Sequence, residues 1–199
     1  MIKNIIFDFG NVLITWQPQR IFSRMVPPEE LDSFMQNVWK EEWNNNLDSG
    51  ASLADNEQAL KKKYPQHSKY IAAFHARWHE SLGDEIAGSV ALLAQLQAAG
   101  YATYGLSNWS AETFPAARKE HPFFSSFNGI VLSGEEKVRK PDPKIYAILL
   151  ERYRLLPEQC VFIDDRQENL DAAKKMGMAG ILFTSPARAR EALKRMSVL

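Results

Sequence analysis

Chemically versatile side chains end several apolar runs of this sequence. They are Asp8 after "NIIF", Ser107 and Asn108 at the end of "YGLSN", and Asp164 with Asp165 at the end of "VFIDD"; Lys140 lies in "RKPDP", beyond a further apolar run. A carboxylate at a strand tip can serve as a nucleophile or a metal ligand, and a lysine can neutralise a phosphate or that carboxylate. A serine hydroxyl and neighbouring backbone N–H groups can hold phosphate oxygens. Together these residue types favour phosphoryl transfer through an aspartyl-phosphate, with Mg²⁺ offsetting the carboxylate charge.

Each of these residues, taken alone, also has a structural interpretation. An Asp after a strand often caps a helix or forms a turn, Ser107 and Asn108 fit turn chemistry, and "KPDP" can start a helix. The ordered set of four favours a functional site, because the carboxyl ends of parallel strands emerge at one edge of a sheet. Asn169, one helical turn beyond Asp165, joins the set.

Five apolar runs have the length of buried strands. They are Ile2–Phe7, Ala102–Ser107, Gly129–Leu132, Val161–Asp164 and Ala179–Phe183. Amphipathic segments of helical length lie between the later runs. One begins at Asp142, a predicted N-cap, with Pro143 in the first turn, and another ends at Gly177. Strands that alternate with helices predict an α/β fold, a Rossmann-like parallel sheet with helices on both faces.

Residues 15–84 interrupt this alternation. They hold no convincing buried strand, and "EELDSFMQNVWKEEW" and "SKYIAAFHARWHESL" have helical spacing. We therefore expect a helical cap over residues 15–84, inserted into an α/β core formed by residues 1–14 and 85–199. An insertion after the first strand lies over the carboxyl ends of the strands, in the position of a lid.

The composition argues against several classes of function. The 199 residues carry 24 basic and 24 acidic side chains, so the net charge of zero indicates no nucleic acid or anionic membrane as partner. No apolar run has the length of a membrane span, and the N-terminal run is too short for a secretory signal. The single cysteine, Cys160, fits a reducing, cytoplasmic setting and is predicted to be a packed thiol. The oligomeric state is left open by the sequence.

The order and spacing of these motifs resemble those of the haloacid dehalogenase (HAD) superfamily, in the branch with a helical cap after the first motif. The motifs match "IIFDFGNVL", "GLSN", "RKPDPKIY" and "VFIDDRQENLDAA", and the resemblance spans nearly the whole chain. Within the superfamily the sequence is most similar to bacterial sugar-phosphate phosphatases of the alpha-D-glucose-1-phosphate phosphatase type. The resemblance implies a Mg²⁺-dependent phosphatase that acts on a small phosphorylated metabolite, with a sugar phosphate as the expected substrate.

The resemblance also implies a metal site. Asp8 would be the nucleophile and, with the backbone carbonyl of Gly10 and the side chain of Asp165, a ligand of Mg²⁺. Asp164 and Asn169 would support the metal waters and the catalytic lysine.

Substrate contacts are implied in the same way. Ser107 and Asn108 would hold the transferring phosphoryl group, and Lys140 would stabilise charge on the nucleophile and the phosphate. Gly10 and Asn11 of the first motif would also contact the substrate.

Gly10 is a departure from the superfamily pattern. Most phosphatases of the superfamily carry a second Asp at this position, which protonates the leaving oxygen and later activates water. Three interpretations follow: a phosphatase that manages without this group, a metal-independent 2-haloacid dehalogenase, or a non-catalytic binding protein with the same fold. The paired carboxylates Asp164 and Asp165 favour the phosphatase, because they would repel Asp8 without a cation.

Residues of the predicted cap are candidates for substrate selection. Trp16 and Arg20 follow the first motif closely and are expected to face the site. The stretch Glu41–Gly50 is rich in Trp, Asn and Asp, which suit a sugar face and sugar hydroxyls. The alternative interpretation makes Trp43 part of the cap core and Asn44–Asn46 a solvated turn.

Three further residues have two possible roles. His75 and His79 lie at i and i+4, a spacing that can bind metal, but helix surface or packing is favoured because no third ligand is apparent. Trp109 follows Ser107 and Asn108, where it can line the pocket mouth or pack under the cap.

Overall fold

A five-stranded parallel sheet forms the centre of the protein. The computed structural model describes residues 1–199. The strands follow the order β5-β4-β1-β6-β7, and every neighbouring pair is parallel. Their bounds are β1 (Asn4–Phe7), β4 (Ala102–Ser107), β5 (Gly129–Leu132), β6 (Cys160–Asp164) and β7 (Ala179–Leu182). All five predicted strands are present, which confirms the α/β sheet, although β1 begins at Asn4 rather than Ile2.

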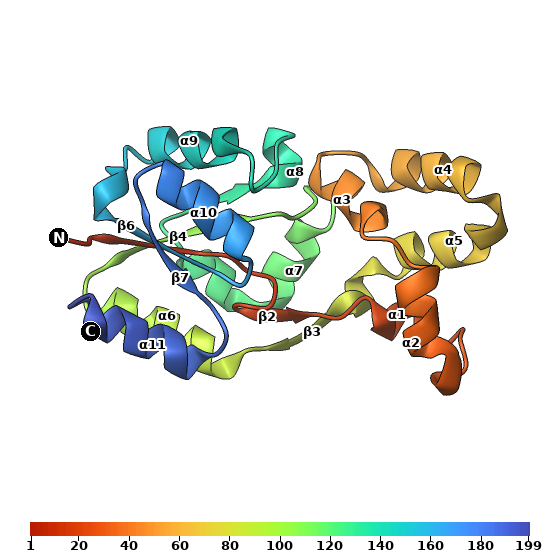
Figure 1. Ribbon diagram of the computed structural model, residues 1–199, viewed down its shortest axis with the longest axis horizontal. Coiled ribbons are helices and arrows are strands. Elements are labelled where there is room, and N and C mark those ends of the chain that lie inside the picture. The colour runs from red at the N-terminus through yellow and green to blue at the C-terminus, as the bar shows by residue number, and fades with distance from the viewer.

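Helices cover both faces of the sheet (Figure 1). On one face lie α6 (Ala87–Ala98) and α11 (Pro186–Arg195), and on the other lie α9 (Pro143–Arg152) and α10 (Gln167–Lys175). Successive β1 side chains point to opposite faces, so Ile5 and Phe7 join one apolar cluster while Ile6 joins the other. Burial on both faces explains why the strand sequences are continuous apolar runs.

The helix ends follow the sequence signals. Asp142 caps α9, with its side chain accepting a hydrogen bond from the Lys144 N–H at 2.9 Å, and Pro143 is the first helical residue. Gly177, at φ +88°, follows α10 in the left-handed region that glycine adopts without strain. These caps confirm the predicted start of α9 and the predicted end of α10.

The insertion after β1 begins and ends in a two-stranded antiparallel ribbon. Its strands are β2 (Ile14–Trp16) and β3 (Leu82–Glu85). The expectation was that residues 15–84 hold no convincing buried strand, and the two strands found at the ends of this segment are short and largely unburied. The two strands are only three and four residues long and mostly lie at or near the surface, so they lack the apolar run on which the prediction depended.

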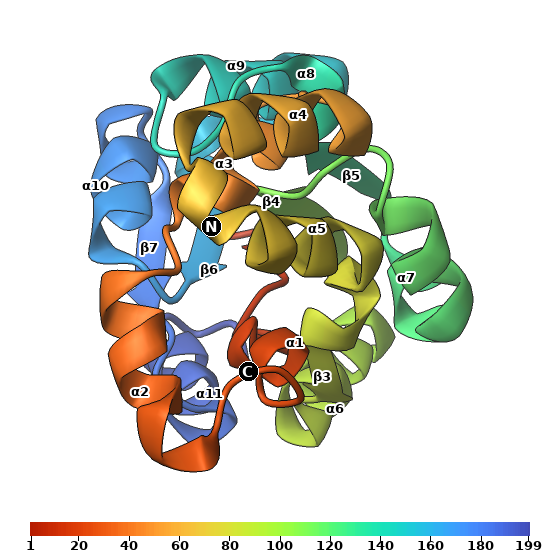
Figure 2. The same cartoon turned by 90° about the vertical axis from the view of Figure 1, so that its right-hand side faces the viewer.

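Five helices lie between the two strands of the ribbon. Their bounds are α1 (Gln19–Phe22), α2 (Pro28–Asn37), α3 (Glu42–Asp48), α4 (Leu53–Lys63) and α5 (Ser68–Ala76). Figure 1 shows these inserted helices beyond one end of the sheet, and Figure 2 views them from that side. Phe22, Trp43 and Phe74 are fully buried among these helices and belong to the same apolar cluster as Phe7 and Phe9.

Short elements complete the chain. They are α7 (Phe114–Glu120), α8 (Ser133–Glu136) and the 3-10 turns η1 (Pro65–His67), η2 (Trp78–Ser81), η3 (Pro122–Ser126) and η4 (Pro157–Gln159). No helix combines the length and the apolar composition that crossing a membrane requires.

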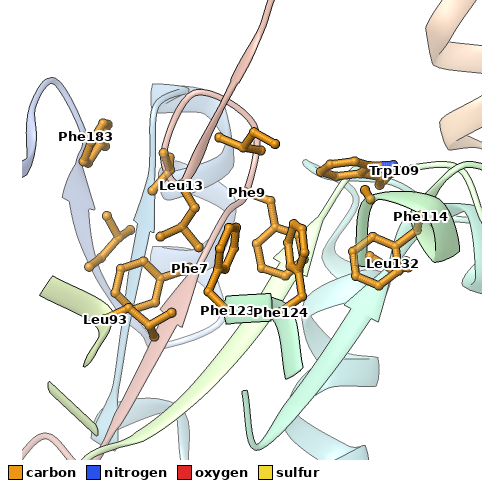
Figure 3. Packing of buried hydrophobic residues seen from close by; sticks show 14 of the residues in the cluster. Phe7, Phe9, Leu13, Leu93, Trp109, Phe114, Phe123, Phe124, Leu132 and Phe183 are labelled. Carbon is orange, nitrogen blue, oxygen red and sulfur yellow. The ribbon is translucent and has the colours of Figure 1, made fainter. Parts of the chain in front are cut away.

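Aromatic side chains fix the segment that follows β1. Phe9 is fully buried among Trp109, Phe114 and Phe124, with its ring centroid 4.8 Å from that of Phe124 (Figure 3). A Cβ at Gly105 of β4 would overlap the Phe9 ring, so glycine is needed there for the ring to fit. This packing anchors the backbone directly after Asp8.

Candidate active site

Asp8 lies where β1 ends, at the carboxyl edge of the sheet. It is almost buried, with 8% of the residue exposed. Its Oδ1 accepts hydrogen bonds from the Ser107 hydroxyl at 2.8 Å and from the Phe9 N–H at 2.7 Å. Ser107 ends β4, so the pairing of β1 with β4 brings this hydroxyl to the carboxylate. Two neighbouring strand ends thus orient Asp8.

Lys140 is the buried cation of this edge. Its Nζ lies 3.0 Å from Asp8 Oδ1 and 2.7 Å from Asp164 Oδ2. Burial alone would lower the pKa of Lys140, but the charges of Asp164 and Asp8 outweigh it and raise that pKa. Burial raises the pKa of Asp8 above its ordinary value, and Lys140 opposes this shift. Asp8 therefore depends on nearby positive charge to stay ionised.

Asn108 holds the backbone of Lys140. Its Oδ1 accepts from the Lys140 N–H at 2.8 Å, and its Nδ2 donates to the Lys140 carbonyl at 3.0 Å. The backbone of Lys140 thus engages both the oxygen and the nitrogen of the Asn108 side-chain amide. The side chain of Asn108 therefore fixes the loop that carries Lys140.

Asp164, at the end of β6, is surrounded by donors. Its Oδ1 accepts from the Arg166 N–H at 2.8 Å, and Asn169 Nδ2 donates to both carboxylate oxygens at 2.9 and 3.0 Å. The Tyr146 hydroxyl donates to the Asn169 carbonyl at 2.9 Å. Asp164 therefore orients Lys140 and Asn169 and has little capacity left for a substrate.

Three carboxylates could hold a divalent cation. Single oxygens of Asp8, Asp164 and Asp165 all lie within 4.8 Å of one another. Burial raises the pKa of Asp165, and the charge of Asp164 raises it further. The three close carboxylates outnumber the one ammonium group of Lys140, so negative charge is in excess. Hard oxygen ligands and excess negative charge are what Mg²⁺ requires. The donor set fits the expected metal.

Gly10 and Asn11 form the turn that follows Asp8. Asn11 adopts φ +56°, a left-handed conformation that Asn tolerates, and its Oδ1 accepts from the Trp16 N–H at 3.0 Å. A Cβ at Gly10 would have no heavy atom within 4 Å. The turn leads the chain from the core into β2 and leaves open space beside Gly10.

A cavity of about 260 Å³ is lined by both the sheet edge and the insertion. The core contributes Asp8, Gly10, Asn11, Ser107, Asn108, Trp109, Lys140, Asp165, Arg166 and Asn169. The ribbon and the inserted segment contribute Ile14, Trp16, Trp39, Glu41, Asn44, Asn45, Asp48, Trp78 and Leu82. The residues predicted at the strand ends therefore converge on one cavity, except that Asp164 is fully buried and does not line it.

Comparison with known proteins gives the family. A family of haloacid dehalogenase-like hydrolases matches residues 2–177. The sesquiterpene phosphatase astK of Aspergillus oryzae is 30% identical over 182 residues, which cover 92% of this chain and 90% of that protein. The chain belongs to the haloacid dehalogenase-like hydrolases.

Two solved structures share the fold. The wild-type HAD family enzyme bt-2542 of Bacteroides thetaiotaomicron, in complex with magnesium and inorganic phosphate, has a TM-score of 0.71 and 24% identity over 93% of this chain and 96% of its own. The L-2-haloacid dehalogenase of Xanthobacter autotrophicus has a TM-score of 0.68 and 20% identity over 90% and 76%. At these identities the similarity shows that this chain shares the fold of the two enzymes.

Some of the cap residues predicted to face the site line the cavity, and others are packed away from it. Trp16 lines the cavity, but Arg20 does not, because its Nη1 donates to the Leu82 carbonyl at 3.2 Å. Trp43 is fully buried in the core of the insertion, which supports the packing alternative. Asn44 and Asn45 line the cavity from α3, so the alternative of a solvated turn is wrong.

The residues with two possible roles are also placed. His75 is buried, with Nδ1 bonded to the Ile71 carbonyl and Nε2 to Asn56, so it packs within the insertion. Trp109 both lines the cavity and packs against Phe9. Cys160 is a buried thiol in β6, as predicted.

Sequence reasoning missed several cavity residues of the hydrolase. They are Ile14, Trp39, Trp78, Leu82 and Arg166. Glu41 and Asp48 lie inside the stretch Glu41–Gly50, but nothing in the local pattern separates a cavity carboxylate from a solvated one. Asp48 comes close to the core where α3 packs against α8.

Proposed function

We propose that this hydrolase is a Mg²⁺-dependent phosphatase of a small phosphorylated metabolite and works through a phosphorylated Asp8. The observation that carries this proposal is the Asp8 carboxylate, held by Ser107 and Lys140 within a cluster of acidic side chains. The similarity to a sesquiterpene phosphatase supports it, as does the shared fold with an enzyme crystallised with magnesium and phosphate.

The chemistry assigned to the chain is nucleophilic. Three donors engage Oδ1 of Asp8 and not Oδ2, so the carboxylate is fixed while one oxygen stays available to attack phosphorus. Lys140 and Ser107 would stabilise the phosphoryl oxygens as charge builds on them.

Asp8, Asp165 and the Gly10 carbonyl would hold the metal. When bound, Mg²⁺ would supply positive charge to the phosphoryl oxygens and keep the neighbouring carboxylates ionised. Asp164 and Asn169 would set the position of Lys140 beside this group.

Residues 15–84 are assigned the role of a cap that selects substrate. Asn45 and Glu41 offer polar contacts to sugar hydroxyls, and Trp16 offers an aromatic face, so a sugar phosphate is the first candidate. A sesquiterpenyl phosphate is the second, favoured by the four tryptophans of the lining and by the relative from Aspergillus oryzae. The single buried cysteine supports a reducing, cytoplasmic location.

Phosphate release tests the proposal. Sugar phosphates, farnesyl phosphate and p-nitrophenyl phosphate are incubated with the protein, with Mg²⁺ or with EDTA. We expect release from at least one ester, its loss in EDTA, and no turnover by Asp8→Asn. Asp171→Asn, which changes an exposed carboxylate of α10, serves as the matched control.

The two other interpretations give different results. A dehalogenase would release chloride from 2-chloropropionate whether or not chelator is present. A non-catalytic protein would bind a phosphate ester without turnover. Either result, together with no Mg²⁺-dependent phosphate release, contradicts the proposal.

A further inference from the structure

The core residues of the candidate site leave no side chain free to donate a proton to the leaving oxygen. Breaking a phosphate ester puts an electron pair on that oxygen, and a positioned acid is typically worth ~10²–10⁴ in rate. The core carboxylates have other tasks: Asp8 is the nucleophile, Asp165 faces the metal position, and Asp164 is occupied by its donors. Lys140 is paired with two of them, and no histidine lines the cavity.

Besides Asp8, Asp165 and the exposed Glu41, a fourth carboxylate, that of Asp48, lines the same cavity. It ends α3, lines the cavity and is 4% exposed. Its Oδ2 accepts a hydrogen bond from Asn44 Nδ2 at 2.8 Å, whereas its Oδ1 is buried without any partner. An unpartnered buried carboxylate oxygen is costly unless it carries a proton or meets a ligand. A group that donates a proton to a bound substrate meets both conditions, because it carries a proton before the reaction and contacts a ligand during it.

The insertion is seated so that Asp48 stays near the core. Helix α3 contacts α8, and a Cβ at Gly50, just after α3, would lie 2.9 Å from Lys137 Cγ and 3.1 Å from the Gly134 carbonyl. Gly50 has φ +93°, so glycine permits both this turn and this close approach. The end of α3 is therefore held tightly against the loop that leads to Lys140.

The surroundings of Asp48 suit proton transfer near neutral pH. Burial raises its pKa to about 7; Arg139 opposes this shift, the charge of Asp8 adds to it, and the Asn44 hydrogen bond and Lys140 lower it. A general acid works best when its pKa lies near the working pH.

We propose that Asp48 is the general acid and base of this hydrolase. It would replace the second Asp that most phosphatases of the superfamily carry at the position of Gly10. This inference rests on the proposed phosphatase function. In the first step an Asp8 oxygen bonds to phosphorus, the ester P–O bond breaks, and the Asp48 proton passes to the leaving oxygen. In the second step Asp48 takes a proton from water as that water attacks phosphorus, and the bond between phosphorus and Asp8 breaks. Phosphate leaves with both carboxyl groups in their starting states.

A matched pair of esters separates proton transfer from other roles. Phenyl phosphate and p-nitrophenyl phosphate have similar shapes, but the nitrophenolate leaves without needing a proton. In Asp48→Asn we expect kcat/KM to fall ~10²–10⁴-fold for phenyl phosphate and for the best sugar phosphate, with little change for p-nitrophenyl phosphate. The alkaline limb of the kcat/KM profile for phenyl phosphate should also disappear, because only protonated Asp48 donates. Asp32→Asn, an exposed carboxylate of α2, is the control.

The open space beside Gly10 allows a rescue experiment. Since a Cβ there would meet no heavy atom within 4 Å, Gly10→Asp can be added to Asp48→Asn. The double variant should recover kcat/KM for phenyl phosphate at least tenfold over Asp48→Asn. A second variant leaves Asp48 intact if Asp48→Asn does not fold: Asn44→Ala removes a hydrogen bond that lowers the pKa of Asp48, so the alkaline limb should move to higher pH.

Three results would overturn the role of Asp48. These are equal losses on both aryl esters, no loss on either, and an alkaline limb that Asn44→Ala leaves in place. If the unmodified protein hydrolyses phosphate esters, such results reject Asp48 alone. If the unmodified protein hydrolyses none, the phosphatase function fails together with it.

Discussion

Lys140 is ion-paired to two carboxylates that come from different strands. It is 2% exposed, so its charge is compensated by Asp8 and Asp164 rather than by water. Removing one partner of a buried ion pair is costly because the remaining charges lose their compensation. Lys140 therefore links the stability of the fold to the reactivity of the candidate nucleophile.

Replacing Lys140 should affect both properties. In Lys140→Met we expect the free energy of unfolding to fall by about 3–5 kcal/mol, the usual cost of breaking a buried pair, and phosphate release to be lost. Urea unfolding and a phosphate assay measure the two effects. Lys144→Met, an exposed lysine of α9, should change neither. An unchanged free energy of unfolding in Lys140→Met would refute the structural half of this prediction.

Asp48 should make stability depend on pH. Its pKa rises from the ordinary 3.8 to about 7 on folding, so the folded state binds the proton more tightly. This contribution is present in full below pH 4 and is lost as pH rises toward about 7. The free energy of unfolding of Asp48→Asn, measured relative to that of the unmodified protein, should therefore be higher at pH 8 than at pH 4. We expect this change to be a few kcal/mol. Thermal unfolding of both proteins across this range tests it, and parallel Tm curves would contradict it.

The residues at the strand ends were predictable, whereas Asp48 was not. Asp8, Ser107 and Asp164 each follow an apolar run, and parallel pairing alone brings such ends together. Asp48 reaches the same cavity through packing between two helices far apart in the sequence. No local pattern encodes a contact of that kind.

The ribbon of β2 and β3 carries the chain into and out of the inserted helices. It is tightly built, because a Cβ at Gly83 would overlap Thr15 Oγ1. Its strands escaped prediction because short, half-exposed segments show neither a long apolar run nor clear alternation. The helices themselves were predictable from their spacing.

Crowding the ribbon should disturb how the inserted helices pack on the core. In Gly83→Ala we expect the free energy of unfolding to fall by about 1–3 kcal/mol, as for other overpacked sites. The kcat/KM for the best phosphate ester should also fall, because Trp16 and the inserted helices move relative to Asp8. Thr15→Ala added to Gly83→Ala removes the overlapping oxygen and should restore much of both. Failure of the double variant to recover would point away from steric overlap.

At the scale of the whole molecule, a bound metal should stabilise the fold. The sheet brings the three carboxylates together only when the protein is folded, so Mg²⁺ binds the native state preferentially. A concentration of 100 times Kd should add about 2.7 kcal/mol and raise Tm. Asp165→Asn should remove most of this rise and Asp171→Asn should retain it. An equal rise in both variants would exclude Asp165 as a ligand.

The alternation of strands and helices in the core was predictable because each part of it obeys a short-range rule. Apolar runs, the N-cap at Asp142 and the glycine after α10 all act within a few residues. How the insertion rests on the core depends instead on side-chain fit, such as Gly50 against Lys137. That fit decides which cap residues face the cavity.

The aromatic lining has a practical consequence. Four of the five tryptophans line the cavity, and the Trp78 ring centroid lies 5.2 Å from that of Trp16 and 5.9 Å from that of Trp109. The fifth, Trp43, is fully buried elsewhere. Indole emission responds to polarity and to nearby quenching groups, so filling the cavity changes the light emitted by most of the fluorophores at once. The intrinsic tryptophan fluorescence of the unmodified protein should therefore report ligand binding in the cavity. Unlabelled esters can then be ranked by their Kd in fluorescence titrations.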